Sequence, residues 1–379
     1  MSPKKEIERR IRKAERGLVG LSHRIHAHPE LAFEEVRASA WVAEQLSAAG
    51  FAVEHGCYGL PTAIRATIGS GRQHIAICAE YDALPTMGHA CGHNIIAAAA
   101  VGAGLGLAGL ADDLGLTVTV LGTPAEEGGG GKVLMLERGA FDGLDAAMMV
   151  HPAAAEMDAM PGSAISMFDV SYQGAPAHAG AYPERGVNAA DAMTVAQVAI
   201  GLLRQQTASA DRIQGIVTEA GSAANVIPDT SRGRWIVRSD TVEALAPLKA
   251  RVQRCFEAGA HATGCELTTV PAGPDYADLR PDPGLLAMYR ANAEALGRTF
   301  PDVSGGPAVG AATDMGDVSH VVPAIHPMLG LDCAPAVNHQ PEFAAACLTP
   351  SADRAILDGA IAMAWTAVDL ATTSTKVSP

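Results

Sequence analysis

The segment "HIAICAEYDALP", residues 74–85, joins an apolar stretch to a polar end that begins at Glu80 and Asp82. Three further segments are apolar runs of the same kind, rich in Val, Ile, Thr and Ala: "TAIRATIG" (62–69), "TVTVLGTPAEE" (117–127) and "DAAMMVHPA" (145–153). Helical patterns lie between them. This alternation predicts an α/β fold in which helices flank a mostly parallel, buried sheet. Functional groups of such sheets gather outside the carboxyl ends of the strands.

The pattern changes from about Gly162 onward. Strand-like and helix-like segments follow in the order βαββαβ, which is typical of a compact ferredoxin-like α+β domain. A Pro- and Asp-rich linker, "PDYADLRPDPG" (274–284), precedes a return of βα character. We therefore expect a catalytic domain built from residues 1–161 and 275–379 and interrupted by a smaller domain at 162–274.

Composition and charge limit the classes of partner that the chain is expected to bind. The chain has 379 residues, of which 48% are hydrophobic and 18% charged, and a formal net charge of -14. This charge argues against nucleic acid or an anionic membrane as a partner. The basic opening lacks a following apolar run, so no signal peptide is expected. Seven scattered cysteines form no disulfide framework, and a reducing, cytoplasmic setting is predicted.

The heptapeptide "GHACGHN", residues 88–94, places Cys91 and His93 two positions apart around Gly92. In a tight turn these side chains can face one centre, and a zinc-like ion takes about four N, O or S ligands. Further candidates follow other predicted strands or lie late in the chain: Glu126, Glu127, His151 and His339. Singly, each of these residues also fits a structural or surface position. Adjacent glutamates have a chemical use, because one can bind metal while the other acts as a base.

Two glycine-rich segments imitate nucleotide motifs. "GLGLAG" (104–109) fits GxGxxG but lies inside a predicted helix, where packing of small residues explains it better. "EGGGGKV" (127–133) resembles a phosphate loop, yet Glu126 stands where the first Gly belongs and Val133 where Ser or Thr belongs. We interpret neither as a nucleotide site.

Seven motifs together resemble the aminoacylase/carboxypeptidase family of di-metal amidohydrolases. They are "AEYDALPTMGHACGHN", "GTPAEEGGGG", "VHP", "GAPAHAG", "NVIPDT", "TDMGDVSHVVPAIHP" and "NH", in order along nearly the whole chain. They look most like the branch containing hydrolases of p-aminobenzoyl-glutamate, indole-acetyl-amino acids and β-alanyl-lysine dipeptides. Asn94 after "CGH" and Glu80 before "YDALP" depart from the commoner pattern and point to a subgroup.

The resemblance implies a metal centre in which Cys91 bridges two divalent ions, usually zinc or manganese; cobalt and nickel also suit such ligands. It implies that the remaining ligands are His93, Glu127, His151 and His339. Glu126 would be the general base, and Asp82 would orient a metal ligand without binding the metal itself.

The resemblance also implies that the inserted domain closes over the site and forms a homodimer. Its His178 would polarise the scissile carbonyl or stabilise the oxyanion, from the partner subunit, with help from Asn225. Arg238 is suited to a substrate carboxylate, because its planar cation can bind such a group through two hydrogen bonds.

The leading hypothesis is a metal-dependent hydrolase of small N-acyl amino acids or dipeptides. One alternative is a cysteine hydrolase with Cys91 as nucleophile, which leaves "PAEEG" and two histidines without a role. Another is a catalytically silent binding subunit of a two-subunit enzyme, which the full ligand set with Glu126 disfavours.

Overall fold

The computed structural model describes residues 1–160, 162–301 and 311–375, with the side chains of 374 and 375 excepted. These residues form two compact units. Unit 1 contains residues 1–160, 279–301 and 314–375, and unit 2 contains residues 162–278 and 311–313.

The main sheet of unit 1 has six strands in the order β1-β2-β4-β3-β5-β11. They are β1 (Ala52–His55), β2 (Ile64–Ile68), β3 (Gln73–Ala79), β4 (Leu116–Gly122), β5 (Ala146–Met148) and β11 (Ala324–Ile325). From β4 to β11 all neighbours are parallel, while β1 and β2 pair antiparallel at one edge. A second, parallel pair joins β6 (His151–Ala153) to β12 (Met328–Gly330). The predicted α/β class with a mostly parallel sheet is confirmed.

Helices surround this sheet. They are α1 (Pro3–His26), α2 (Val36–Ala48), α3 (His93–Ala108), α4 (Gly131–Glu137), α7 (Pro283–Ala295), α8 (Met315–Ser319), α9 (Pro341–Ala346) and α10 (Pro350–Thr375). β1 was not predicted, because three of its four residues are exposed and it shows no apolar alternation.

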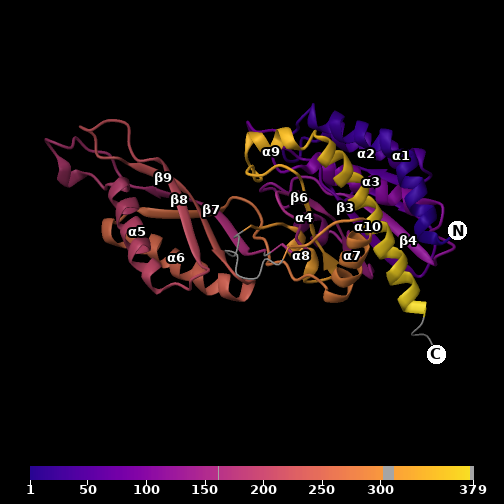
Figure 1. Cartoon of the computed structure of the whole chain (residues 1–379). Coiled ribbons are helices and arrows are strands. Elements are labelled where there is room, and N and C mark those ends of the chain that lie inside the picture. The colour runs from indigo at the N-terminus through magenta and orange to yellow at the C-terminus, as the bar shows by residue number, and fades with distance from the viewer. Residues whose placement is uncertain (161, 302–310, 376–379) are drawn as a thin grey trace. The chain divides into compact units, whose positions relative to one another are not determined.

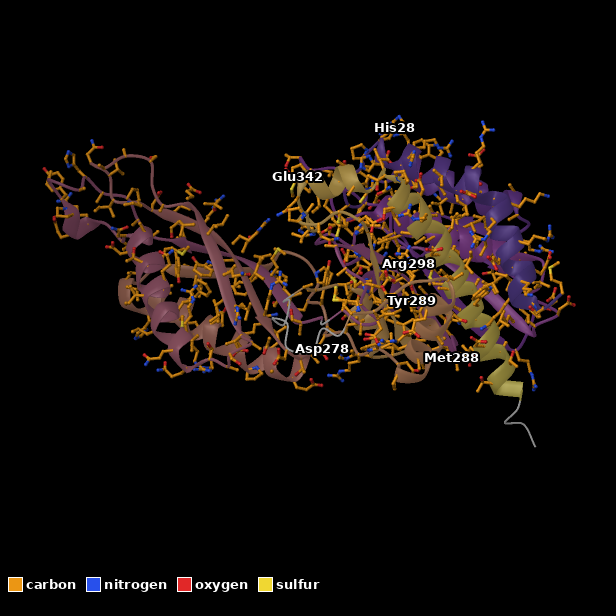
Figure 2. The ribbon with its side chains drawn as sticks, viewed as in Figure 1. His28, Asp278, Met288, Tyr289, Arg298 and Glu342 are labelled. Carbon is orange, nitrogen blue, oxygen red and sulfur yellow. The ribbon has the colours of Figure 1, made fainter. Side chains whose placement is uncertain are left out.

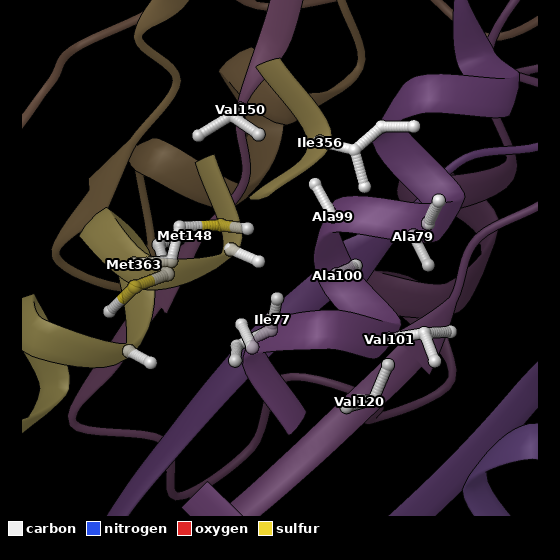
Figure 3. Packing of buried hydrophobic residues seen from close by; sticks show 14 of the residues in the cluster. Ile77, Ala79, Ala99, Ala100, Val101, Val120, Met148, Val150, Ile356 and Met363 are labelled. Atoms are coloured by element: carbon white, nitrogen blue, oxygen red, sulfur yellow. The ribbon is translucent and has the colours of Figure 1, made fainter. Parts of the chain in front are cut away.

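Helix α3 lies at the centre of unit 1 and packs against β3, α1 and α10 (Figure 1). Its Ala99, Ala100 and Val101 are fully buried in one cluster with residues of the sheet and of α10 (Figure 3). The helix depends on its small residues: a Cβ added at Gly104 would lie 2.9 Å from Val120 Cγ2, and one at Gly106 would lie 2.8 Å from Ile11 Cδ1. The "GLGLAG" glycines are therefore packing residues.

Helix α10 is long and apolar enough to cross a membrane by length and composition. In unit 1 it packs against α1, α3 and α7, and 72% of its apolar window is buried. Burial against other helices accounts for its composition.

Arg298, which is labelled in Figure 2, joins residues 279–301 of unit 1 to the first chain segment, residues 1–160. Its guanidinium lies 3.2 Å from Glu156 Oε2 and 3.0 Å from Asp358 Oδ2, with 13% of the side chain exposed. Because Glu156 comes from the first segment and Asp358 from α10, this cation joins three parts of one unit.

Unit 2 is a four-stranded antiparallel sheet in the order β10-β7-β9-β8. Its elements are β7 (Ala164–Gln173), η1 (Pro183–Arg185), α5 (Ala189–Leu203), η2 (Arg204–Gln206), β8 (Arg212–Glu219), β9 (Thr230–Ser239), α6 (Val242–Thr263) and β10 (Glu266–Pro271). Helices α5 and α6 cover one face of the sheet (Figure 1). The order of the main elements is βαββαβ, as the sequence predicts.

Candidate metal centre

The turn of "GHACGHN" brings Cys91 to the beginning of α3. Gly92 has φ +80°, a left-handed conformation that favours glycine, and a Cβ there would lie 2.3 Å from Pro152 Cγ. Cys91 is 8% exposed and His93 is fully buried. The bare glycine thus lets the backbone approach the "VHP" segment closely, and the two side chains reach the carboxyl ends of the strands.

Asp82 orients two of the candidate ligands. Its Oδ1 lies 2.9 Å from His93 Nδ1, and its Oδ2 accepts a 3.0 Å hydrogen bond from the Glu127 amide. A histidine that donates from Nδ1 to a carboxylate presents Nε2 as a ligand, an arrangement common behind metal-bound histidines. His93 Nε2 is buried and has no hydrogen-bond partner among the described residues.

Cys91 belongs to two groups of possible ligands. Its Sγ lies 3.4 Å from His151 Nε2 and 3.5 Å from His339 Nε2. One group is Cys91, His93 and His151, the other is Cys91, Glu127 and His339, and within each group the ligand atoms lie within 4.8 Å of one another. A sulfur and a nitrogen bound to one zinc-like ion lie roughly 3.5 Å apart. The five side chains therefore fit two neighbouring ions that share one thiolate.

The other ring nitrogens agree with this arrangement. His151 Nδ1 lies 2.8 Å from the Pro152 carbonyl oxygen, so it donates there and leaves Nε2 toward Cys91. His339 Nε2 lies 3.5 Å from Glu127 Oε1. His339 has φ +67°, and its amide donates to the Ala90 carbonyl, which joins its loop to the Cys91 turn.

The two adjacent glutamates occupy different environments. Burial and then the Glu80 carboxylate raise the pKa of Glu126 well above its usual value. Burial alone would raise the pKa of Glu127, but contact with His339 and the charge of His93 lower it. Opposite shifts in neighbouring carboxyl groups separate a proton-transferring group from an ionised ligand.

The environment of Cys91 does not suit a free nucleophile. Burial raises the pKa of its thiol well above the ordinary value, and the Glu127 carboxylate adds to the shift. A reactive cysteine needs a lowered pKa, whereas a coordinating ion deprotonates the thiol directly. The cysteine-hydrolase alternative is disfavoured.

Unit 2 brings His178 and Asn225 together. The Ala179 amide donates to the Asn225 carbonyl at 3.0 Å, and His178 pairs with Val226 in an isolated bridge. His178 Nδ1 accepts from the amides of Gly180 and Ala181, so its Nε2 carries the proton and can donate. Arg238 lies at the other end of β9 from Asn225, so these two side chains do not meet within the unit.

Some buried polar residues of unit 1 have no role that the sequence motifs predict. Lys132, from the dismissed "EGGGGKV" segment, is fully buried and contacts Glu80 and Asp314. His326 is 1% exposed, and its ring centroid lies 5.3 Å from that of His151. The repeated "HP" in "VHP" and "IHP" was the available signal, since β5 and β11, the strands before these histidines, are parallel neighbours.

Comparison with known proteins identifies the family of these motifs. Residues 76–355 match the sequence profile of Peptidase family M20/M25/M40. The mouse Xaa-Arg dipeptidase is 38% identical over 97% of this chain and 88% of its own length. One of the subunits of the p-aminobenzoyl-glutamate hydrolase from Escherichia coli K12 is 31% identical over 63% of this chain and 54% of its own.

A solved structure with the same fold is a dinuclear metal-binding peptidase of family M20 from Bacillus subtilis. It superposes with a TM-score of 0.73 at 22% identity, over 96% of this chain and 99% of the other. Together these matches confirm the family resemblance that the sequence motifs indicate.

Proposed function

Because this chain belongs to Peptidase family M20/M25/M40, we propose that it cleaves the amide bond of dipeptides, foremost those ending in arginine or lysine. Small N-acyl amino acids are the wider substrate class. The two ligand groups that share Cys91 carry this proposal, because a thiolate between two sets of N and O ligands is built for a pair of ions. The Xaa-Arg dipeptidases at 38% and 36% identity support the basic residue.

We propose that Cys91, His93, Glu127, His151 and His339 hold two divalent ions, zinc or manganese, with cobalt and nickel as further candidates. When bound, such ions supply Lewis acidity to the attacking water and to the scissile carbonyl. A thiolate ligand requires a reduced cysteine, which agrees with the predicted reducing cytoplasm.

Glu126 is the proposed proton carrier. It is 7% exposed, and one of its carboxylate oxygens lies 3.9 Å from His93 Nε2. In the proposed reaction Glu126 takes a proton from the attacking water and passes it to the leaving nitrogen as the amide C–N bond breaks. The products are a carboxylic acid and a free amine.

The inserted domain supplies the remaining groups. His178 Nε2 donates to the carbonyl oxygen as negative charge develops there, and Asn225 supports the same loop. Arg238 receives the free carboxylate of the substrate. We propose that His178 acts from the partner subunit of a homodimer.

The edge of unit 2 is suited to such a dimer. Strand β8 pairs only with β9 in the described chain, and its Ile216 is 63% exposed. On α5, Val198 is 59% and Leu202 70% exposed. An open edge strand that exposes an apolar side chain can pair with the same edge of a second copy across a twofold axis.

The experiment is elemental analysis of the purified protein together with release of free amine. The substrate panel contains Xaa-Arg and Xaa-Lys dipeptides, N-acetyl amino acids and p-aminobenzoyl-glutamate, each with and without a chelator. We expect about two equivalents of metal, release that stops with chelator and returns with added Mn²⁺ or Zn²⁺, and fastest cleavage of the basic dipeptides.

Different results would reject different parts of the proposal. Binding of no metal under any loading would reject the metal centre and the function with it. Chelator-sensitive cleavage confined to N-acyl amino acids would leave the chemistry in place and reject the dipeptide preference. A Cys91→Ser variant with unchanged metal content would reject the shared thiolate.

A further inference from the structure

A buried ion triad lies beside the candidate metal centre. Lys132 Nζ contacts Glu80 Oε1 and lies 2.7 Å from Asp314 Oδ1, and none of the three side chains is exposed. The Lys132 amide donates to Asp314 Oδ2 at 2.8 Å, so both Asp314 oxygens have partners. Glu80 follows β3, Lys132 is in the first turn of α4, and Asp314 precedes α8.

The second carboxylate oxygen of Glu80 is not bound by Lys132. Glu80 Oε2 is buried and has no hydrogen-bond partner among the described residues, and the same holds for His93 Nε2. These two atoms face each other at 3.5 Å. Two buried, unpaired polar atoms at this separation each carry a large desolvation cost unless a third group lies between them.

The separation matches a shared ion. A nitrogen and an oxygen that both bind one zinc-like ion lie roughly 3.4 Å apart. From His93 Nε2, the nearest oxygens of Glu126 and Glu127 lie at 3.9 and 4.0 Å, so Glu80 is nearer than either. Glu80, His93 and Glu126 also form a third group whose possible ligand atoms lie within 4.8 Å of one another.

We propose that Glu80 is an additional carboxylate of the metal centre, with Oε2 directed at the ion that His93 binds and Oε1 held by Lys132. Lys132 is then a positioning residue, since it holds Glu80 Oε1 while Oε2 faces His93. The inference rests on the proposed function insofar as the chain must bind divalent metal.

Charge supports the same assignment. Five carboxyl groups gather around this centre: Glu80, Asp82, Glu126, Glu127 and Asp314. Lys132 is the one lysine or arginine in the ion pairs described for this group. Buried carboxylates require cations or hydrogen-bond donors, and Lys132 contacts only Glu80 Oε1 and Asp314 in this group. A divalent cation between His93 and Glu80 would supply positive charge to Glu80 Oε2.

The test compares Glu80→Gln with Asp314→Asn. Each variant neutralises one of the two carboxylates that contact Lys132, but only Glu80 has an oxygen facing His93. Metal-free protein is titrated with Zn²⁺ in competition with a chromophoric chelator, and Co²⁺ is added separately to record its visible absorption spectrum. Neither readout depends on turnover.

We expect Glu80→Gln to lower the affinity for one of the two ions by about 10- to 100-fold and to change the Co²⁺ spectrum. Asp314→Asn should keep both affinities and the wild-type spectrum, although both variants should melt at lower temperature because Lys132 loses a partner. Equal metal affinities and spectra in the two variants would overturn the proposal.

A third variant keeps the test decisive if Glu80→Gln fails to fold. Glu80→Asp retains the charge beside Lys132 but withdraws the carboxylate from His93, so it should fold and still bind one ion more weakly. Unchanged affinity in Glu80→Asp would reject the role of Glu80. Wild-type protein that binds no Zn²⁺ would instead reject the proposed function itself.

Discussion

The two units use their polar residues in opposite ways. Every buried Glu, His and Lys of the described chain lies in unit 1, whereas Asp278 is the one buried carboxyl of unit 2. In unit 1, Glu80, Glu126, His151 and His326 follow β3, β4, β5 and β11, and Glu80 and His151 contact further members of this buried group. In unit 2, His178 and Asn225 are exposed, and β8 leaves one edge of the sheet open in the described residues.

This difference separates the proposed metal site from the surfaces proposed for substrate capture and subunit pairing. Burying charged groups costs free energy. A buried cluster of them therefore points to a functional site that binds a ligand or transfers a proton. Polar side chains on exposed loops and strand edges carry no such cost of burial. These surfaces suit substrate capture and pairing of subunits. Substitutions in the buried cluster of unit 1 should therefore affect metal binding and the chemical step, and substitutions at the open β8 edge of unit 2 should affect assembly.

The largest effect is expected from Glu126→Gln. Loss of a general base lowers the rate by about 10²- to 10⁴-fold, while Glu127 and the other ligands keep the metal. Turnover and metal content should be measured together. The matched control is Glu137→Gln in α4, which is exposed and should change neither quantity. A Glu126→Gln enzyme with near-normal turnover would remove the base from this position.

The metal affinity should rise with pH between about 6 and 8. Burial alone would lower the pKa of His93, but Asp82 raises it well above the ordinary value, and burial raises the pKa of the Cys91 thiol. Both groups are therefore protonated in metal-free protein at neutral pH, and each must lose a proton to bind. The logarithm of the Zn²⁺ affinity should increase by up to about two per pH unit.

Calorimetry in buffers of different ionisation enthalpy measures the protons released on binding. Release near two equivalents agrees with deprotonation of both groups. An affinity that is flat across this pH range would contradict the assignment of Cys91 and His93 as ligands.

Asp82→Asn should weaken metal binding by about 10- to 100-fold. The amide keeps the size of the side chain but removes the charge behind His93 and the strong acceptor of the Glu127 amide. Competition with a chelator measures the change. Asp145→Asn is a suitable control, because the Asp145 carboxylate also accepts a hydrogen bond from a backbone amide. Its donor is the amide of His74 at the start of β3, at 2.7 Å. Equal affinities in the two variants would mean that Asp82 does not orient the ligands.

The smallest effect is expected in unit 2. Ile216→Lys in β8 should weaken the proposed homodimer by about tenfold or more, since a buried apolar contact is worth about 1.5–3 kcal/mol. Val270→Lys serves as control on β10, the opposite edge strand, where Val270 is 53% exposed. Sedimentation equilibrium measures both. Dissociation by Val270→Lys alone would move the interface to the other edge of the sheet.

Much of the fold could be predicted from the sequence. The apolar runs before "AEYD", "PAEEG" and "VHP" carry a local signal, because a strand buried on both faces needs continuous apolar residues. The order βαββαβ of unit 2 could be predicted for a related reason, since alternation marks strands with one exposed face. β1 could not be predicted, because its residues are mostly exposed and show no such pattern.

The sequence also determined most of the candidate site. Cys91, His93, Glu126, Glu127 and His151 lie in or next to segments with recognisable spacing, and the strand ends predicted that they would meet. The structure brings them together with His339, whose loop comes from the distant end of the chain. The assigned roles of these residues stay predictions until metal binding and turnover are measured.

Only the tertiary structure decided the partners of Glu80, Lys132, Asp314 and His326. Lys132 follows four glycines and has the appearance of a phosphate-loop lysine in the sequence, yet it is buried between two carboxylates. A local pattern records which face of a strand or helix is apolar, but it carries no information about which distant charge will neutralise a buried one. That choice depends on the packing of separate elements, because a buried ion is stable only where its partner is placed within a few ångströms.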